Sequence, residues 1–127
     1  MHNFFKHSYA EMLLSNGILY FTYLPIGSFD ENVARQLVAA RLQLQREQAY
    51  PVLCDIRALS LPTKKARHYL AVEGSLLIKA VAYWVQPHST QELTRFFKNI
   101  NQPVVPSAIF TQRDEALTYL NQFIHDL

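Results

Sequence analysis

The chain has 127 residues, half of them hydrophobic, and a formal net charge of +2 at pH 7. This balance predicts one globular domain over residues 1–127, and it excludes a disordered chain or a protein that binds nucleic acid through bulk positive charge. No apolar stretch is long enough to span a membrane and the single cysteine cannot form an internal disulfide, so we expect a cytoplasmic protein without stable membrane insertion.

Two strands joined by a tight turn are predicted near the N-terminus. Residues 8–14 and 18–24 are rich in apolar and aromatic side chains, and Asn16-Gly17 lies between them. Asn and Gly tolerate the positive φ angles of a two-residue hairpin turn. The two strands should therefore pair antiparallel.

A helix and a buried strand follow the hairpin. Asp30 is a suitable N-cap for a helix over about residues 31–48. Arg41 and Gln45 fall outside the apolar stripe of this helix, so we expect both to face water. Residues 51–57 then form a short apolar run with a charged end, which is typical of the central strand of an α/β sheet.

Helices and strands alternate through the C-terminal half of the chain. The elements expected here are, in order, a helix over residues 64–72 capped by Thr63, a strand over 80–86, a helix that begins at the Ser89–Glu92 capping box and stops at Asn101 and Pro103, a strand over 107–110 and a last helix capped by Thr111.

The predicted order, β-β-α-β-α-β-α-β-α, gives an α/β fold with a mostly parallel five-stranded sheet. If sequential strands are neighbours, right-handed crossovers place the helices mainly on one face. The other face would then be poorly covered, and its aromatic side chains, such as Tyr20 and Trp84, suit a homodimer interface. The alternative is that these aromatic residues belong to the core.

The order of elements and the central strand together resemble a STAS domain, the anti-sigma-factor-antagonist-like fold. The resemblance is carried by the run Tyr50-Pro51-Val52-Leu53-Cys54-Asp55, a strand that ends in Asp, and by the Thr63-capped helix after it. In phosphorylatable members of that family an Asp-Ser pair opens this helix, and a kinase partner modifies the Ser. The matching positions here hold Thr63 and Lys64, so the phosphoacceptor is not carried over. The resemblance implies a stand-alone, non-enzymatic domain that works by docking.

Positive charge gathers just after the central strand, because no acidic residue falls between Asp55 and Glu73. Cations in the first turn of a helix oppose the helix dipole, whereas free N–H groups beside Lys and Arg form an anion site. The plainer interpretation is a solvated helix face on which Arg57 pairs with Asp55 or Glu73. The site that we predict for a partner or an anion consists of Asp55, Arg57, Thr63, Lys64, Lys65, Arg67 and His68.

No residue pattern predicts catalysis, a metal site or a cofactor. The five histidines form no i, i+4 pair with a third ligand, Cys54 has no adjacent base, and no glycine-rich phosphate loop occurs. We therefore expect a non-enzymatic regulatory module that docks an unidentified protein partner through the loop and helix after the central strand. The alternative is a carrier or sensor of a small anionic or lipid-like ligand, whose headgroup would be held by Lys64, Lys65 and Arg67.

Overall fold

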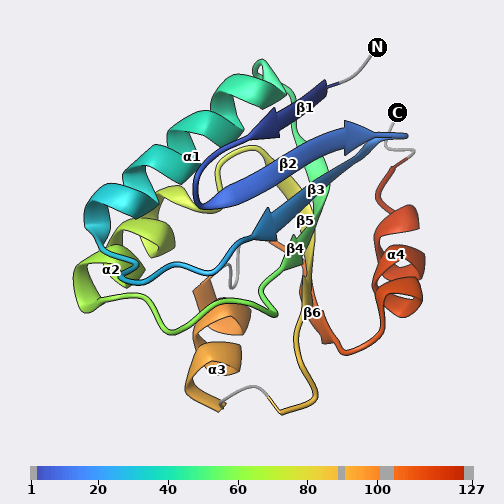
Figure 1. Cartoon of the computed structure of the whole chain (residues 1–127). Helices are drawn as coiled ribbons and strands as arrows, with labels where there is room; N and C mark the ends of the chain where they lie inside the picture. The colour runs from blue at the N-terminus through green and yellow to red at the C-terminus, as the bar shows by residue number, and fades with distance from the viewer. Residues whose placement is uncertain (1–2, 89–90, 101–104, 125–127) are drawn as a thin grey trace.

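A computed structural model of the chain describes residues 3–88, 91–100 and 105–124, except for the side chains of Lys98 and Ile100. Within these residues, four helices pack on a central sheet of six strands (Figure 1). In chain order the elements are β1 (Asn3–Lys6), β2 (Ala10–Ser15), β3 (Ile18–Tyr23), α1 (Glu31–Gln45), β4 (Tyr50–Asp55), α2 (Lys64–Glu73), β5 (Ile78–Trp84), α3 (Gln91–Ile100), β6 (Ser107–Phe110) and α4 (Arg113–Asn121).

The six strands lie side by side in the order in which they occur along the chain. Strands β1, β2 and β3 pair antiparallel, and β3 to β6 pair parallel. The α/β class is therefore confirmed, but the sheet is mixed and has six strands, where five mostly parallel ones were expected. The additional strand is β1, whose four residues pair along β2. Four residues are too few to show a clear alternation of apolar and polar side chains. They form a strand because their backbone pairs with β2.

The hairpin turn and two helix caps agree with the sequence prediction. Asn16 and Gly17 both have positive φ and join β2 to β3. The side chain of Asp30 accepts a hydrogen bond from the Val33 backbone N–H at 3.0 Å at the start of α1. The hydroxyl of Thr63 accepts from the Ala66 N–H at 3.2 Å at the start of α2. The predicted signals at Ser89, Asn101 and Pro103 lie outside the described residues.

Helices α1, α2 and α3 cover one face of the sheet, whereas α4 packs on the other face (Figure 1). Each of the first three helices connects two neighbouring parallel strands, so the right-handed crossover rule holds all three on one side. Among the described residues no strand follows helix α4, so the rule does not constrain it. The prediction that this face is uncovered is therefore wrong over β4, β5 and β6, which α4 contacts.

Small side chains let α4 approach the sheet closely. Ala80 and Ala82 of β5 and Ala116 of α4 are fully buried in a second, smaller core cluster on this face. The part of the face formed by β1 and β2 stays open, and Phe4 of β1 is 52% exposed there. The covered half of the face is thus core, and the open half is surface.

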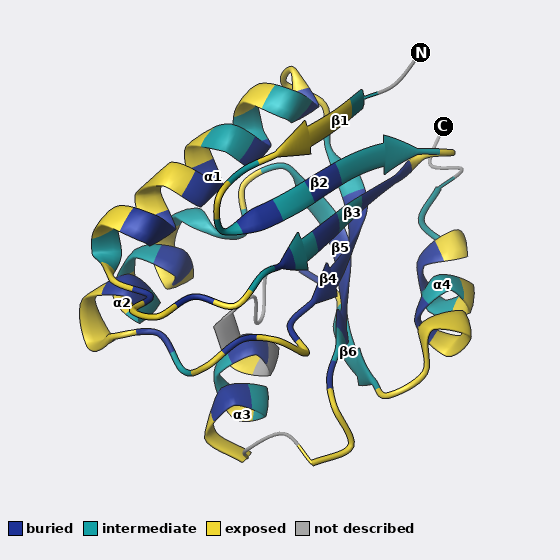
Figure 2. Cartoon of the chain, in the orientation of Figure 1, coloured by how far each residue is buried: buried dark blue, intermediate teal, exposed yellow. Residues whose placement is uncertain are grey.

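Two polar residues of α1 depart from the prediction. Arg41 and Gln45 were expected to face water, but they are only 4% and 1% exposed. The prediction was wrong because the last turns of α1 lie under the turn that joins α2 to β5, to which both side chains hydrogen bond. Figure 2 shows the buried residues of α1 along its inner side.

Candidate functional site

The predicted site residues are divided between the two sides of the sheet. Asp55 follows Leu53 on the face that α4 partly covers, because residues two apart in a strand point to the same side. The chain then crosses to the opposite face, where Lys64, Lys65 and His68 lie on α2. The structure therefore separates Asp55 and Arg57 from the cations of α2 and does not form one continuous site from all seven residues.

Asp55 and Arg57 form a bidentate ion pair. The Arg57 Nε and Nη2 atoms donate to the two carboxylate oxygens of Asp55 at 3.0 and 2.9 Å, and the Arg57 backbone N–H donates to Oδ1 at 3.1 Å. The guanidinium carbon of Arg57 also lies 3.4 Å from the centre of the Trp84 ring. The hydrogen bond to Asp55 raises the pKa of Arg57. This pair stabilises the C-terminal end of β4, and it is the pairing with Asp55 that the plainer interpretation of the sequence predicts. Both carboxylate oxygens of Asp55 already accept hydrogen bonds from Arg57.

A groove runs between the outer sides of α1 and α2. It is lined from α1 by Glu31 and Arg35 and from α2 by Lys64, Lys65, Arg67, His68, Tyr69, Val72 and Glu73. We call this surface the α1–α2 groove. Four predicted site residues therefore lie together in it, and Thr63 caps the helix that carries them.

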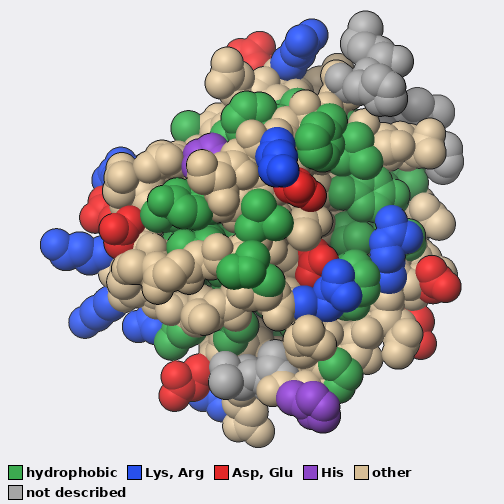
Figure 3. All heavy atoms as spheres, viewed as in Figure 1, with side chains coloured by type: hydrophobic (Ala, Val, Ile, Leu, Met, Phe, Trp, Pro, Cys, Tyr) green, Lys and Arg blue, Asp and Glu red, His purple; other side chains and the backbone are tan. Residues whose placement is uncertain are grey.

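The α1–α2 groove is basic and includes an exposed apolar side chain. It presents four cations against two carboxylates, and Glu31 is already paired with Arg35 at 2.6 Å. The Arg35 guanidinium also lies 4.6 Å from the centre of the Tyr69 ring. Val72 is 61% exposed and adds an apolar contact point. Basic side chains project from the molecule at the side of α2 (Figure 3). This arrangement suits a partner that carries negative charge and an apolar side chain.

Sequence reasoning missed the contribution of α1 to this groove. Glu31 and Arg35 are spaced as an i, i+4 pair, which the sequence displays, but this spacing gives no information about which helix lies beside them. The packing of α1 against α2 is a tertiary contact that brings Arg35 over Tyr69.

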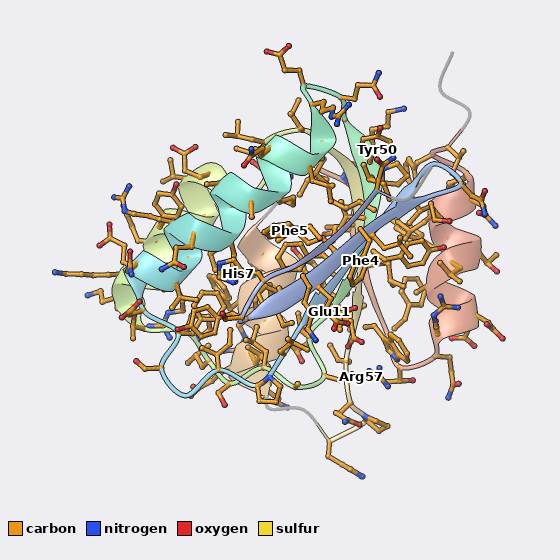
Figure 4. All side chains as sticks on the ribbon, turned by 45° about the horizontal axis from the view of Figure 1, so that its top comes forward. Phe4, Phe5, His7, Glu11, Tyr50 and Arg57 are labelled. Carbon is orange, nitrogen blue, oxygen red and sulfur yellow. The ribbon has the colours of Figure 1, made fainter. Side chains whose placement is uncertain are left out.

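A second surface lies on the open half of the α4 face. Phe4, Glu11, Leu13, Tyr20, Trp84 and Arg113 line a shallow hollow there, together with the buried Asp55. The Arg113 guanidinium is 5.6 Å from the centre of the Tyr20 ring. In Figure 4, Phe4 and Glu11 lie on the side of α4, and Phe5 lies on the side of α1. We call this surface the open sheet face.

Comparison with known proteins identifies a family for the chain. A family model described as "Domain of unknown function (DUF7793)" matches residues 12–124. The chain belongs to the DUF7793 family. No curated protein and no solved structure matches it. The DUF7793 match runs from β2 to the residues after α4 and therefore includes the whole α1–α2 groove.

The described part of the DUF7793 chain holds no group of three or more His, Cys, Asp or Glu side chains placed to bind a metal ion. None of its helices combines the length and the apolar character that a membrane crossing requires.

Proposed function

We propose that the chain is a non-enzymatic regulatory module that docks an acidic segment of a partner protein in the α1–α2 groove. One observation carries the proposal: Lys64 and Lys65 are exposed in the same groove as the exposed Val72, and neither lysine forms an ion pair with any described residue. Uncompensated cations that share a groove with an apolar side chain favour an acidic segment that also carries an apolar residue.

The expected interaction is weak and sensitive to salt. An exposed ion pair contributes only about 0.2–1 kcal/mol, so the lysines supply orientation and a faster association more than affinity. Most of the binding free energy would come from apolar contact with Val72 and the Tyr69 ring. Salt should therefore weaken the complex but not abolish it.

The proposed STAS-like character agrees with the order of elements. From β2 onward the order is β-β-α-β-α-β-α-β-α, which is the order that resembles a STAS domain. Thr63 uses its hydroxyl as the cap of α2, and Lys64 follows it. Docking requires no phosphorylatable residue at the start of α2, whereas a phosphorylation switch does. The residues at this position therefore support docking.

The proposal is tested by fluorescence anisotropy with a labelled Asp- and Glu-rich peptide that contains one leucine. We expect Lys65→Glu to weaken binding about three- to tenfold, because it replaces attraction by repulsion at an exposed site. Lys6→Glu changes the same charge on β1, away from the groove, and should leave the affinity within about twofold. Equal losses in both variants would contradict the proposal. Titration with inorganic phosphate and with anionic lipid vesicles tests the alternative, a carrier or sensor of a small anionic or lipid-like ligand.

We also propose that two copies pair through the open sheet face. Phe4 supplies an exposed aromatic side chain there, and Glu11 and Arg113 supply opposite charges within the same hollow. A two-fold axis would let each charge meet its opposite on the second copy.

Analytical ultracentrifugation of two variants tests this pairing. Phe4→Glu should dissociate the dimer, whereas Phe5→Glu changes the neighbouring residue on the other face of β1 and should not. Phe5 is 41% exposed, so the two substitutions are matched in exposure and strand position. A wild-type chain that stays monomeric at high concentration would contradict the pairing.

A further inference from the structure

Arg41 is a buried cation whose partners are all neutral. Its Nη1 atom donates to the Gln45 side-chain oxygen and to the Leu76 carbonyl at 2.9 Å, and its Nη2 atom reaches the Gly74 carbonyl at 3.5 Å. No ion pair among the described residues includes Arg41, and its Nε–H donates to none of them. Arginine stays charged at neutral pH, so a positive charge lies uncompensated beneath α1 and α2.

A small cavity lies beside this charge. It occupies about 50 Å³ between α1, α2 and the sheet, and its wall is apolar except for Arg41, Gly74, Cys54, Tyr23 and Tyr83. Tyr23 is 7% exposed, and its hydroxyl forms no hydrogen bond with the described part of the chain. Burial raises the pKa of the Cys54 thiol and of Tyr23, so both groups are neutral at pH 7. Arg41 is thus the one charged group among the described residues of the wall.

We infer that this cavity is a binding site for a small monovalent anion such as chloride, held by the guanidinium of Arg41 and the hydroxyl of Tyr23. By this measure a single water-sized group needs roughly 10–15 Å³, so the cavity has room for an ion of chloride size. Gluconate is several times larger than chloride, so the same space disfavours it. This inference does not rest on the proposed docking function, because the cavity lies beneath α1 and α2 and the groove lies on their outer sides.

The charge of the site favours an anion over water. A buried charge without a counter-charge is destabilising, and a neutral water molecule compensates only part of that cost. A chloride ion would neutralise the guanidinium and accept hydrogen bonds from both Arg41 and Tyr23. The apolar remainder of the wall, including Leu37 and Phe97, would strengthen that attraction by excluding bulk water.

Thermal unfolding in sodium chloride and in sodium gluconate, at one fixed total salt concentration, tests the site. We expect the midpoint to rise as chloride replaces gluconate, by roughly 5 °C at a tenfold excess of chloride over its dissociation constant. Arg41→Gln should abolish this dependence. Arg35→Gln is the matched control, because it removes an exposed guanidinium from the same helix and should keep the dependence.

Two further measurements keep the inference falsifiable if Arg41→Gln does not fold. Tyr23→Phe keeps the ring and should weaken chloride binding about fivefold. Crystals grown in sodium bromide should show an anomalous scattering peak within hydrogen-bond distance of Arg41. A cavity that contains only water in those crystals, equal midpoints in the two salts, or an unchanged chloride dependence in Tyr23→Phe would each overturn the inference.

Discussion

Replacing Gln45 with alanine should destabilise the fold far more than the same change two residues earlier on α1. Gln45 is 1% exposed, and its side-chain nitrogen donates to the Gln48 carbonyl at 2.9 Å and to the Leu77 carbonyl at 2.8 Å. Its side-chain oxygen accepts from Arg41. The residue thereby joins the end of α1 to the turn before β5, where Leu77 has a φ of 60°.

The size of the effect follows from these three hydrogen bonds, two to neutral carbonyls and one from the charged Arg41. A neutral hydrogen bond contributes about 1 kcal/mol net and one from a charged group about 1.5–3 kcal/mol, so the loss of all three costs about 3.5–5 kcal/mol. Alanine is the better helix former and returns a few tenths of a kcal/mol. We therefore expect the free energy of unfolding to fall by about 4 kcal/mol, with a thermal midpoint lower by about 15 °C.

Urea unfolding followed by circular dichroism measures this change. Gln43→Ala is the matched control, because Gln43 lies exposed on the same helix and its replacement should change stability by less than about 0.5 kcal/mol. Equal midpoints for the two variants, with unchanged denaturant slopes, would refute the reasoning. That result would mean that water replaces the Gln45 hydrogen bonds without cost.

Two other stability predictions follow from the cap of α2 and from the buried thiol. Thr63→Ala should cost about 1 kcal/mol in urea unfolding, whereas Ser60→Ala in the exposed loop before it should cost almost nothing. Burial raises the pKa of Cys54 from an ordinary value near 9, so the folded chain keeps a proton that the unfolded chain loses. The contribution of this thiol to the free energy of unfolding should therefore be fully present below pH 9, and above pH 9 it should fall by up to about 1.4 kcal/mol per pH unit. In Cys54→Ala the stability lost at alkaline pH should be smaller. If the free energy of unfolding falls with pH equally steeply in Cys54→Ala, the alkaline destabilisation comes from other groups, such as Tyr23.

The local signals in the sequence were sufficient for most elements. Asn16-Gly17 set the hairpin, and Asp30 and Thr63 set the starts of α1 and α2. These signals work because a turn or a cap is decided by residues within about four positions of each other. The sequence also placed the cations of α2 on an exposed helix, since charged side chains of a helix surface stay in water.

Burial within α1 could not be predicted from the helix pattern. Arg41 and Gln45 are polar, and on a helical wheel they read as surface residues. They are buried because the turn after α2 places backbone carbonyls over them, including those of Leu76 and Leu77. A polar residue can be buried when partners from a distant segment satisfy its donors, and periodicity carries no information about such partners.

Sequence patterns predict the α/β class, the order of elements from β2 onward and the basic character of α2, because each depends on neighbours along the chain. Packing between distant segments joins β1 to the sheet, sets α4 on the opposite face and leaves the Arg57–Asp55 pair on the other side of the sheet from the α2 cations. These features depend on which distant surfaces meet. Helix α4 joins no pair of parallel strands in the described part of the chain, so the handedness rule that holds α1, α2 and α3 on one side does not apply to it.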